Sequence, residues 1–405
     1  MLGYTFARTP RRSVAAGPVS RGLGKDPRTD SEHRGAPASQ SSGLQIAHRL
    51  RGIRAGFMVR KGTVWYVFRS MKQMRAMSLI LLLGVFWVVG AAGLQPAHAA
   101  DANGFEWCDI TAPGNAAYPG NRFGVNAGRG SVGYSYRMAK TEVTTGQMLE
   151  FYNTFATQSD ELYQVMRSNI IGWPTVTDPT YPLSAPGSRD ILSPDVPNAG
   201  RVAVRGMTWR IAALYCNWLH HDKSSDWNTI QTGAYDARTF GQNPDGSPTD
   251  QRTRSPGARF WIPSLDEWLK SVFYDPKKDG VGGWWNQPNG SNTPLIPGFP
   301  GVGQTSATVG LMDPVLIPVG SYPDVTTPWG LLDASGSASE WTEEFGAFFG
   351  RHRLLGGSVE GDPDLRFDDP GEQRSGAPWH LIGGLRVATI PGPSAIWVFV
   401  AGTYM

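Results

Sequence analysis

The sequence predicts an α+β domain that is rich in loops, and three observations lead to this class. The 405 residues include 50 Gly, 31 Pro and 15 Trp but only 18% charged residues, which is typical of irregular backbone packed around aromatic side chains. Hydrophobic residues make up 40% of the chain, enough to bury a substantial core. Short segments of helical or strand periodicity alternate with long stretches rich in Gly, Asn and Pro.

The first hundred residues predict export. Residues 77–93 form an uncharged apolar run that follows basic residues and precedes an Ala-His-Ala motif. This is the pattern of a secretory signal peptide, which we assign to residues 77–99 with cleavage after Ala99. The alternative is a membrane anchor, but the run is shorter than the roughly 20 residues that a spanning helix needs. Residues 1–76 form a basic leader, which stays untranslated if the chain starts at Met77.

The charge of the chain divides at the same boundary. Fifteen of the 37 Lys and Arg residues precede residue 101, but only three of the 34 Asp and Glu residues do. The remainder carries 22 positive and 31 negative charges, a net charge of −9. It has no basic patch to neutralise phosphates, so we expect no nucleic-acid partner. We expect an extracellular ligand, polysaccharide or peptide, at the cell surface or outside the cell, and membrane contact only during export or sorting.

The exported part divides into an N-terminal loop segment at 100–133, a domain at 134–390 and an apolar tail at 391–405. Within the domain, periodicity predicts strands at 134–143, 259–263 and 315–322, and helices at 147–155, 208–221 and 264–274. Thr144 or Thr145 caps the first helix, and Ser264 forms a capping box with Glu267 at the third. The apolar faces of the first two helices predict core positions at Met148, Phe151, Tyr152, Phe155, Trp209, Ala212, Ala213, Cys216 and Leu219.

The chain has two cysteines, Cys108 and Cys216, which lie far apart in the sequence. An oxidising compartment permits one disulfide between them, but their spacing does not establish it. We expect unpaired thiols, because Cys216 lies in an apolar helix.

Six motifs occur in the order of one known family: KTEVT at 140–144, WRIAALYCNWL at 209–219, IPSLDEW at 262–268, GLLDASGSASEW at 330–341, GGS at 356–358 and GLRVA at 384–388. In this order they resemble the formylglycine-generating enzyme family, also called sulfatase-modifying factors, over residues 130–390. The resemblance implies a single loop-rich domain of variant C-type-lectin-like topology.

The segment at 330–341 resembles a calcium-binding segment of that family. Position by position, the resemblance implies Asp333 and Glu340 as side-chain ligands of a structural calcium ion, with the carbonyl groups of Gly336 and Ala338. Oxygen ligands on a Gly-rich turn suit this hard cation. The alternative is that Asp333 only caps the turn and Glu340 faces solvent.

The oxidase chemistry of the family depends on two cysteines that follow the GGS element and bind copper(I). Gly361 and Arg366 stand at those positions here, and neither ligates copper(I). We therefore expect no copper and no catalytic residue, and interpret the chain as a pseudoenzyme, a calcium-stabilised binding or structural module. The alternatives are a formylglycine-generating oxidoreductase acting on a protein cysteine, or another enzyme that uses the acidic loop at 360–369.

Three other features have a functional and a plainer interpretation. His220, His221 and Asp222 include metal-ligating types, but we expect a helix end there. The tryptophans of the loops could stack on sugars or peptides, although tryptophans are more often core residues: Trp284, Trp285 and Trp379. The tail resembles a degenerate Pro-Glu-Pro sorting signal with Gly392 in place of the Glu, and otherwise it is an apolar terminus.

Overall fold

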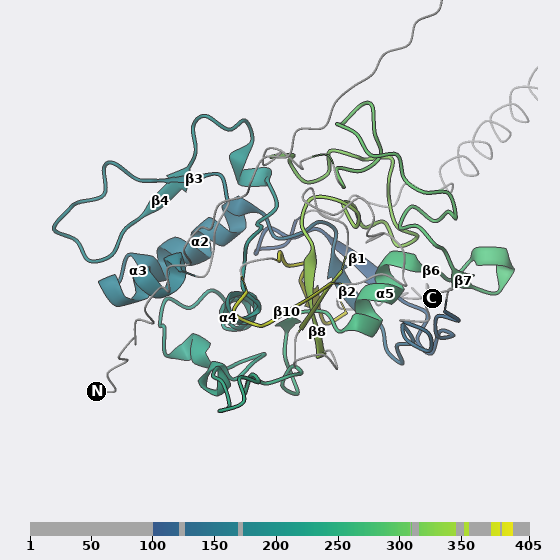
Figure 1. The fold of residues 1–405 in the computed structure, drawn as a ribbon, viewed down its shortest axis with the longest axis horizontal. Helices are drawn as coiled ribbons and strands as arrows, with labels where there is room; N and C mark the ends of the chain where they lie inside the picture. The colour runs from purple at the N-terminus through teal and green to yellow at the C-terminus, as the bar shows by residue number, and fades with distance from the viewer. Residues whose placement is uncertain are drawn as a thin grey trace, which may run out of the picture. The chain divides into compact units, whose positions relative to one another are not determined.

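A computed structural model describes residues 100–120, 126–168, 173–307, 309, 316–345, 352–355, 374–380 and 383–391. The described chain mixes helix and sheet and runs for much of its length through turns and irregular segments (Figure 1). These features agree with the predicted α+β, loop-rich class. The leader, the signal peptide, Gly361, Arg366, the acidic loop at 360–369 and the tail beyond residue 391 lie outside the described residues.

The central sheet joins segments from across the domain. Its four antiparallel strands follow the order β1-β2-β11-β5, with bounds Trp107–Ile110, Tyr136–Ala139, Ala388–Thr389 and Phe260–Trp261. Strand β11 pairs with β2 through Ala388 opposite Met138. The register therefore brings Arg386, just before β11, next to Lys140, just after β2. Strand β1 lies in the segment predicted as loop.

Smaller sheets surround this one. Strands β8, β9 and β10, at Glu340–Phe345, His352–Leu355 and Arg374–Gly376, form an antiparallel sheet in the order β10-β9-β8. The two-stranded pairs are β3 with β4, at Thr175–Thr177 and Asp190–Leu192, and β6 with β7, at Tyr274–Asp275 and Gly283–Trp284.

The three predicted helices are present, and the caps predicted for the first and the third are confirmed. They are α2 at Thr145–Ala156, α4 at Trp209–His220 and α5 at Leu265–Phe273, capped by Thr144, Thr208 and Ser264. A further helix, α3 at Asp160–Arg167, was not predicted, because it has only 8 residues, is polar on average and buries only Met166. Short 3₁₀ helices lie at Ala199–Arg201, Thr229–Gln231, Ala237–Thr239 and Lys278–Gly280.

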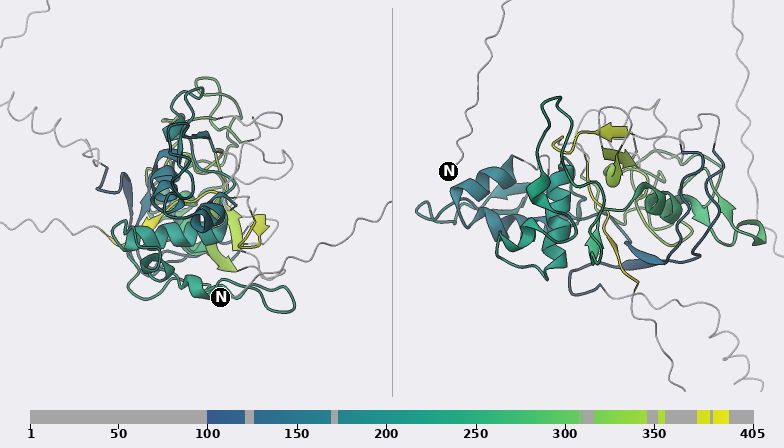
Figure 2. Two further views of the ribbon diagram at one scale, coloured as in Figure 1. Left: turned by 90° about the vertical axis from the view of Figure 1, so that its left-hand side faces the viewer. Right: turned by 90° about the horizontal axis from the view of Figure 1, so that it is seen from below.

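The core lies between the helices and the sheets. All nine predicted core side chains are buried, which confirms the helical faces assigned from periodicity. The ring of Phe151 on α2 packs 5.5 Å from Tyr215 and 5.3 Å from Trp218 on α4, measured between ring centroids. Helices α2 and α3 lie with β3 and β4 at one end of the described domain, and α5 lies with β6 and β7 at the other (Figures 1 and 2).

The predicted strand at 315–322 was wrong, and of the two interpretations of Trp284 the core position was right. Residues 316–322 contain no strand, only an isolated bridge from Pro318 to Val202, because Pro318 lacks an N–H and Gly320 has a φ of +78°. Trp284 is not available for stacking on a ligand, since its ring is buried and its Nε1 donates to the carbonyl of Ala116. In the described part of the chain, no helix combines the length and apolarity that crossing a membrane requires.

Candidate functional site

The segment at 330–341 forms a tight turn that packs on residues 305–307. Asp333 and Ser337 have φ angles of +55° and +56°, and Gly336 has a φ of +89°. A side chain at Gly336 would place its Cβ 2.5 Å from Ser306 Oγ, so only glycine fits there. Ser337 N donates to Ser306 Oγ over 2.8 Å. The Gly-rich sequence is therefore needed for close packing.

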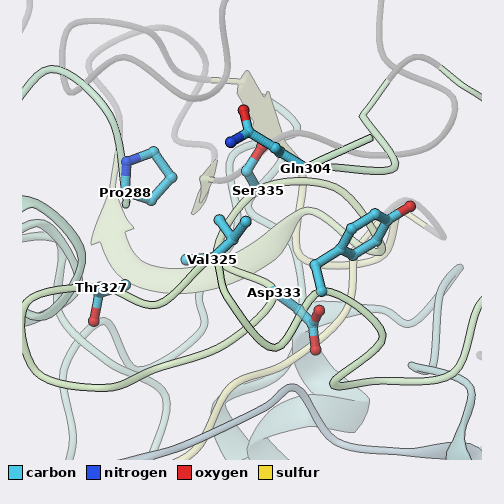
Figure 3. Close-up of a pocket in the computed structure, with 8 residues that line it drawn as sticks. Pro288, Gln304, Val325, Thr327, Asp333 and Ser335 are labelled. Atoms are coloured by element: carbon cyan, nitrogen blue, oxygen red, sulfur yellow. The ribbon is translucent and has the colours of Figure 1, made fainter. Parts of the chain in front are cut away.

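Asp333 lies at the inner end of this turn and is buried. Its Oδ2 accepts a 2.5 Å hydrogen bond from Gly320 N, and burial raises the pKa of the carboxyl group. The side chain lines a cavity of about 10 Å³ that Gln304, Thr327 and Ser335 also line (Figure 3). This space is at the lower limit for one water molecule.

Glu340 does not face solvent. Its carboxylate is 1% exposed, and its Oε2 accepts a 2.5 Å hydrogen bond from Trp268 Nε1 on α5. Its Oε1 lies 2.9 Å from Arg386 Nε and 2.8 Å from Arg386 Nη2. Both carboxylate oxygens thus face N–H donors, and one donor group is a cation.

Arg386 is the residue of this region that sequence reasoning missed. The guanidinium is fully buried and donates to the carbonyl groups of Ala139, Lys140 and Leu332 over 3.1, 2.8 and 2.9 Å. With the bonds to Glu340, its N–H donors are satisfied by four residues, two at the end of β2 and two in the segment at 330–341. The available signal was an arginine inside the apolar run LRVA, where a buried charge requires partners.

Glu142, from the KTEVT motif, is the second carboxylate beside Arg386. It is fully buried, and its Oε2 lies 3.7 Å from Arg386 Nη2. Among the described residues neither of its oxygens has a hydrogen-bond partner. Burial raises the pKa of Glu142 well above the usual range, which favours the protonated form. We call Glu142, Asp333, Glu340 and Arg386 the sealed cluster.

The sealed cluster bears on the predicted calcium site. Calcium prefers six to eight oxygen ligands. Glu340 does not fit as one of them in this arrangement, because a cation there would lie next to the Arg386 guanidinium and would have to displace Trp268 Nε1. Within the described ranges, no group of three or more His, Cys, Asp and Glu side chains is placed to hold a metal ion. Calcium at Asp333 and at the carbonyl groups of Gly336 and Ala338 stays a prediction.

A second arginine is also held between two glutamates. Arg254 Nη2 donates to Glu267 Oε1 over 2.9 Å, and Arg254 Nη1 lies 3.2 Å from Glu343 Oε2. The hydroxyl group of Tyr134 donates to Glu267 Oε1 over 2.9 Å and accepts from Arg254 Nη2 over 2.8 Å. Tyr235 donates to Glu343 Oε1 over 2.7 Å. We call these five residues the rim cluster, because Tyr134 is 46% exposed.

The rim cluster contains a carboxyl group that titrates near neutral pH. Burial raises the pKa of Glu343 to about 7, and the negative charge of Glu267 contributes in the same direction. Burial and the same neighbour raise the pKa of Tyr134 to about 12. The cluster can therefore gain or lose a proton near neutral pH.

The two cysteines are free thiols in different elements. Cys216 on α4 is fully buried, and burial raises its pKa well above the ordinary thiol value. Cys108 on β1 is partly buried, and burial raises its pKa to about 11. Since the thiolate is the form that attacks substrates and binds soft metals, both groups are in their unreactive form at neutral pH.

The histidines at the end of α4 have structural partners. The Nδ1 of His220 accepts from Arg259 N over 3.1 Å, and the Nε2 of His221 lies 3.0 Å from the carbonyl oxygen of Thr232. Asp222 forms an ion pair with Arg259 at 2.8 Å. These contacts agree with the helix-end interpretation of the HHD sequence.

A larger cavity is lined in part by Gly320, the residue whose N–H donates to Asp333. It measures about 400 Å³ and is lined by the end of β2, the start of α2 and residues 100–106. Its charged lining residues are Glu106, Lys140 and Arg201, and its polar ones include Thr141, Thr144 and Gln147. We call it the Lys140–Arg201 cavity. No sequence pattern pointed to it, because its wall combines segments that are far apart in the chain.

Comparison with known proteins gives no family assignment. No protein-family model matches the chain, and no curated protein matches its sequence. Solved structures with some likeness include CarF, with 18% identity over 72% of this chain and 100% of that one and a TM-score of 0.40. Treponema denticola variable protein 1 has 17% identity over 71% of this chain and 95% of that one, with a TM-score of 0.40. PvdO from Pseudomonas aeruginosa has 14% identity over 74% of this chain and 100% of that one, with a TM-score of 0.37.

Likeness at this level carries no argument about the fold or the activity of this chain. The described residues form a mixed helix and sheet domain with long irregular segments.

Proposed function

We propose that the chain is an exported binding module with a formylglycine-generating-enzyme-like scaffold and without the oxidase activity of that family. The six ordered motifs support the scaffold, and the apolar run at 77–93 supports export. One observation supports the absence of oxidase activity: the chain has two cysteines, Cys216 buried and Cys108 partly buried, and both are protonated thiols in separate elements. A copper(I) site needs two thiolates that converge on one ion.

The test is a direct assay for the oxidase reaction. The protein, expressed from the full chain and purified after export, is incubated with copper(I), oxygen and a peptide that carries the sulfatase cysteine motif. Mass spectrometry then follows the peptide, and we expect the cysteine to remain unchanged. Conversion of the cysteine to formylglycine would overturn the proposal. The variants Cys108→Ser and Cys216→Ala would then show which thiol supports the reaction.

We propose a structural role for calcium only where its donors remain available, at Asp333 and the nearby carbonyl groups. In that case a chelator lowers the melting temperature of the wild type. The variant Asp333→Asn is matched, because asparagine tolerates the positive φ and still accepts from Gly320 N, but it lacks the charge. It should be insensitive to the chelator. A wild-type melting temperature that ignores the chelator removes calcium from the proposal and leaves the binding module intact.

A further inference from the structure

We infer that the Lys140–Arg201 cavity is a binding site for a small hydroxylated anion of about monosaccharide size, a sugar carboxylate or a sugar phosphate. This inference deepens the proposed function and rests on it, because it names a ligand class for the binding module. The volume of about 400 Å³ lies in the range of small-molecule sites.

The two cations of the cavity are held in place by the backbone. Lys140 N donates to the carbonyl of Glu106 over 2.8 Å, and Leu332 N donates to the carbonyl of Lys140 over 2.8 Å. Val319 N donates to the carbonyl of Arg201 over 2.8 Å, and Arg201 Nη2 donates back to the carbonyl of Val319 over 3.0 Å. Both side chains therefore start from fixed positions, which lowers the entropic cost of binding a ligand.

The charge of the cavity favours an anion. Lys140 forms an ion pair with Glu106 at 2.8 Å, and this carboxylate is the one acidic side chain in the lining. Arg201 forms no ion pair with any described residue, and its side chain is exposed. A guanidinium matches a carboxylate or a phosphate in geometry. The local excess of positive charge contrasts with the net charge of −9 of the exported part.

Ala100 adds to this excess if the signal peptide is removed as proposed. Ala100 lines the cavity, and cleavage after Ala99 converts its nitrogen into an α-ammonium group. The following residues are anchored, since Asp101 Oδ1 accepts from Phe105 N over 3.0 Å and Asp101 Oδ2 accepts from Trp107 Nε1 over 2.9 Å. Export would thus place a third cation on the cavity wall.

The acceptors in the lining require hydroxyl groups on the ligand. Glu106 uses its Oε2 for Lys140, and its Oε1 accepts no hydrogen bond from the described residues. The hydroxyl of Thr141 donates to the carbonyl of Glu142 over 3.3 Å and keeps its acceptor capacity. A bare anion would be repelled by Glu106, whereas a hydroxylated anion can donate to these oxygens while its charged group faces Arg201.

The test uses the protein expressed from the full chain, with its N-terminus identified by mass spectrometry. Calorimetric titration compares three probes: sodium glucuronate, glucose 6-phosphate and glucose. We expect one or both anions to bind and glucose to bind at least about tenfold more weakly, since an ionic hydrogen bond is worth about 1.5–3 kcal/mol. The anion that binds more tightly identifies the charged group of the natural ligand. Equal binding of glucose, or no binding of either anion, overturns the inference.

Three variants locate the binding. Arg201→Gln should weaken anion binding by about tenfold or more, and Glu106→Gln should strengthen it, because it removes the repelling charge. Glu106 is about half exposed, so this variant keeps the fold even if Arg201→Gln does not. The matched control is Arg238→Gln, whose arginine lies on the surface in an ion pair with Asp236. Equal affinities for Glu106→Gln, Arg238→Gln and the wild type would place any binding elsewhere and overturn the assignment.

The oxidase assay distinguishes a failure of the proposed function from a failure of the proposed ligand class. Formylglycine formation by the wild type overturns the proposed function but leaves any measured anion affinity standing. Failure to bind both anions, with no formylglycine formed, removes this ligand class and leaves the binding module without a named ligand.

Discussion

The sealed cluster and the rim cluster each hold one arginine between two glutamates, but they differ in access to water. Arg386 is 0% exposed and lies between Glu142 and Glu340. Arg254 is 22% exposed and lies between Glu267 and Glu343. In the sealed cluster the Arg386 guanidinium also donates to three backbone carbonyl groups. In the rim cluster Arg254 donates to the hydroxyl group of Tyr134, which is about half exposed.

This difference gives the clusters different physical roles. A fully buried charge cannot be hydrated when its partner is lost, so the sealed cluster should fix the turn at 330–341 against β2 and α5. The rim cluster can admit water and can change protonation near pH 7 through Glu343. The sealed cluster is thus a structural element, and the rim cluster is a titratable one.

The largest expected effect is the loss of the sealed arginine. Arg386→Met leaves the Glu340 charge buried with one remaining donor and removes a hydrogen bond from each of three carbonyl groups. The free energy of unfolding should fall by about 3–5 kcal/mol. Arg254→Met is the matched variant, and it should cost about 1–3 kcal/mol, because the arginine is 22% exposed and water can enter the space that it leaves. Urea unfolding of both proteins measures the difference, and equal losses would contradict the distinction between the clusters.

The second prediction concerns pH. The pKa of Glu343 in the folded protein is about 7, above the value of about 4.3 for an unfolded glutamate. The folded state therefore binds more protons between these values, so this group stabilises the fold at low pH. Its contribution, about 3 kcal/mol, is lost as the pH rises through 7.

Glu343→Gln should remove this component. Urea unfolding at pH 5 and pH 8 should show a smaller fall in stability for Glu343→Gln than for the wild type. The control Glu344→Gln keeps Glu343 and removes the neighbouring carboxylate that pairs with Arg129 on the surface, so its pH-dependent step should match the wild type. Parallel profiles for Glu343→Gln and the wild type would remove the titratable role of the rim cluster.

The smallest expected effect is at Tyr134, the exposed residue of the rim cluster. Tyr134→Phe removes a hydroxyl group that water can replace, so it should cost about 0.5–1 kcal/mol. Tyr136→Phe is the buried counterpart, since its hydroxyl donates to the carbonyl of Glu267 over 2.5 Å at a fully buried position. It should cost about 1–3 kcal/mol, as it removes a buried hydrogen bond that water does not replace. Thermal unfolding compares the pair, and a larger loss for Tyr134→Phe would reverse the assignment of edge and interior.

Sequence reasoning predicted the features that depend on local pattern. The apolar faces of α2 and α4 and the capping box at Ser264 each follow from residues within three or four positions. The short strands escaped prediction: β1 has four residues, β3 and β4 have three, and periodicity is weak at such lengths. Their positions depend on distant partners, as in the pairing of β1 with β2.

The candidate sites depend even more on distant residues. The motif at 330–341 was correctly singled out as a tight turn, but the partners of Glu340 were not predictable. Trp268 and Arg386 lie 72 and 46 residues away in the sequence. The family resemblance implied ligands for a cation and could not show that the Arg386 guanidinium lies beside Glu340. The Lys140–Arg201 cavity gave no local signal at all.

We propose that the chain provides a binding scaffold without a pair of reactive thiolates. A competition titration of the purified exported protein with a coloured copper(I) chelator tests this proposal most directly. We predict that the protein takes no copper(I) from a chelator of high affinity, because Cys108 and Cys216 lie in separate elements as protonated thiols. Uptake of one equivalent of copper(I) that is lost in Cys108→Ser and in Cys216→Ser would contradict it.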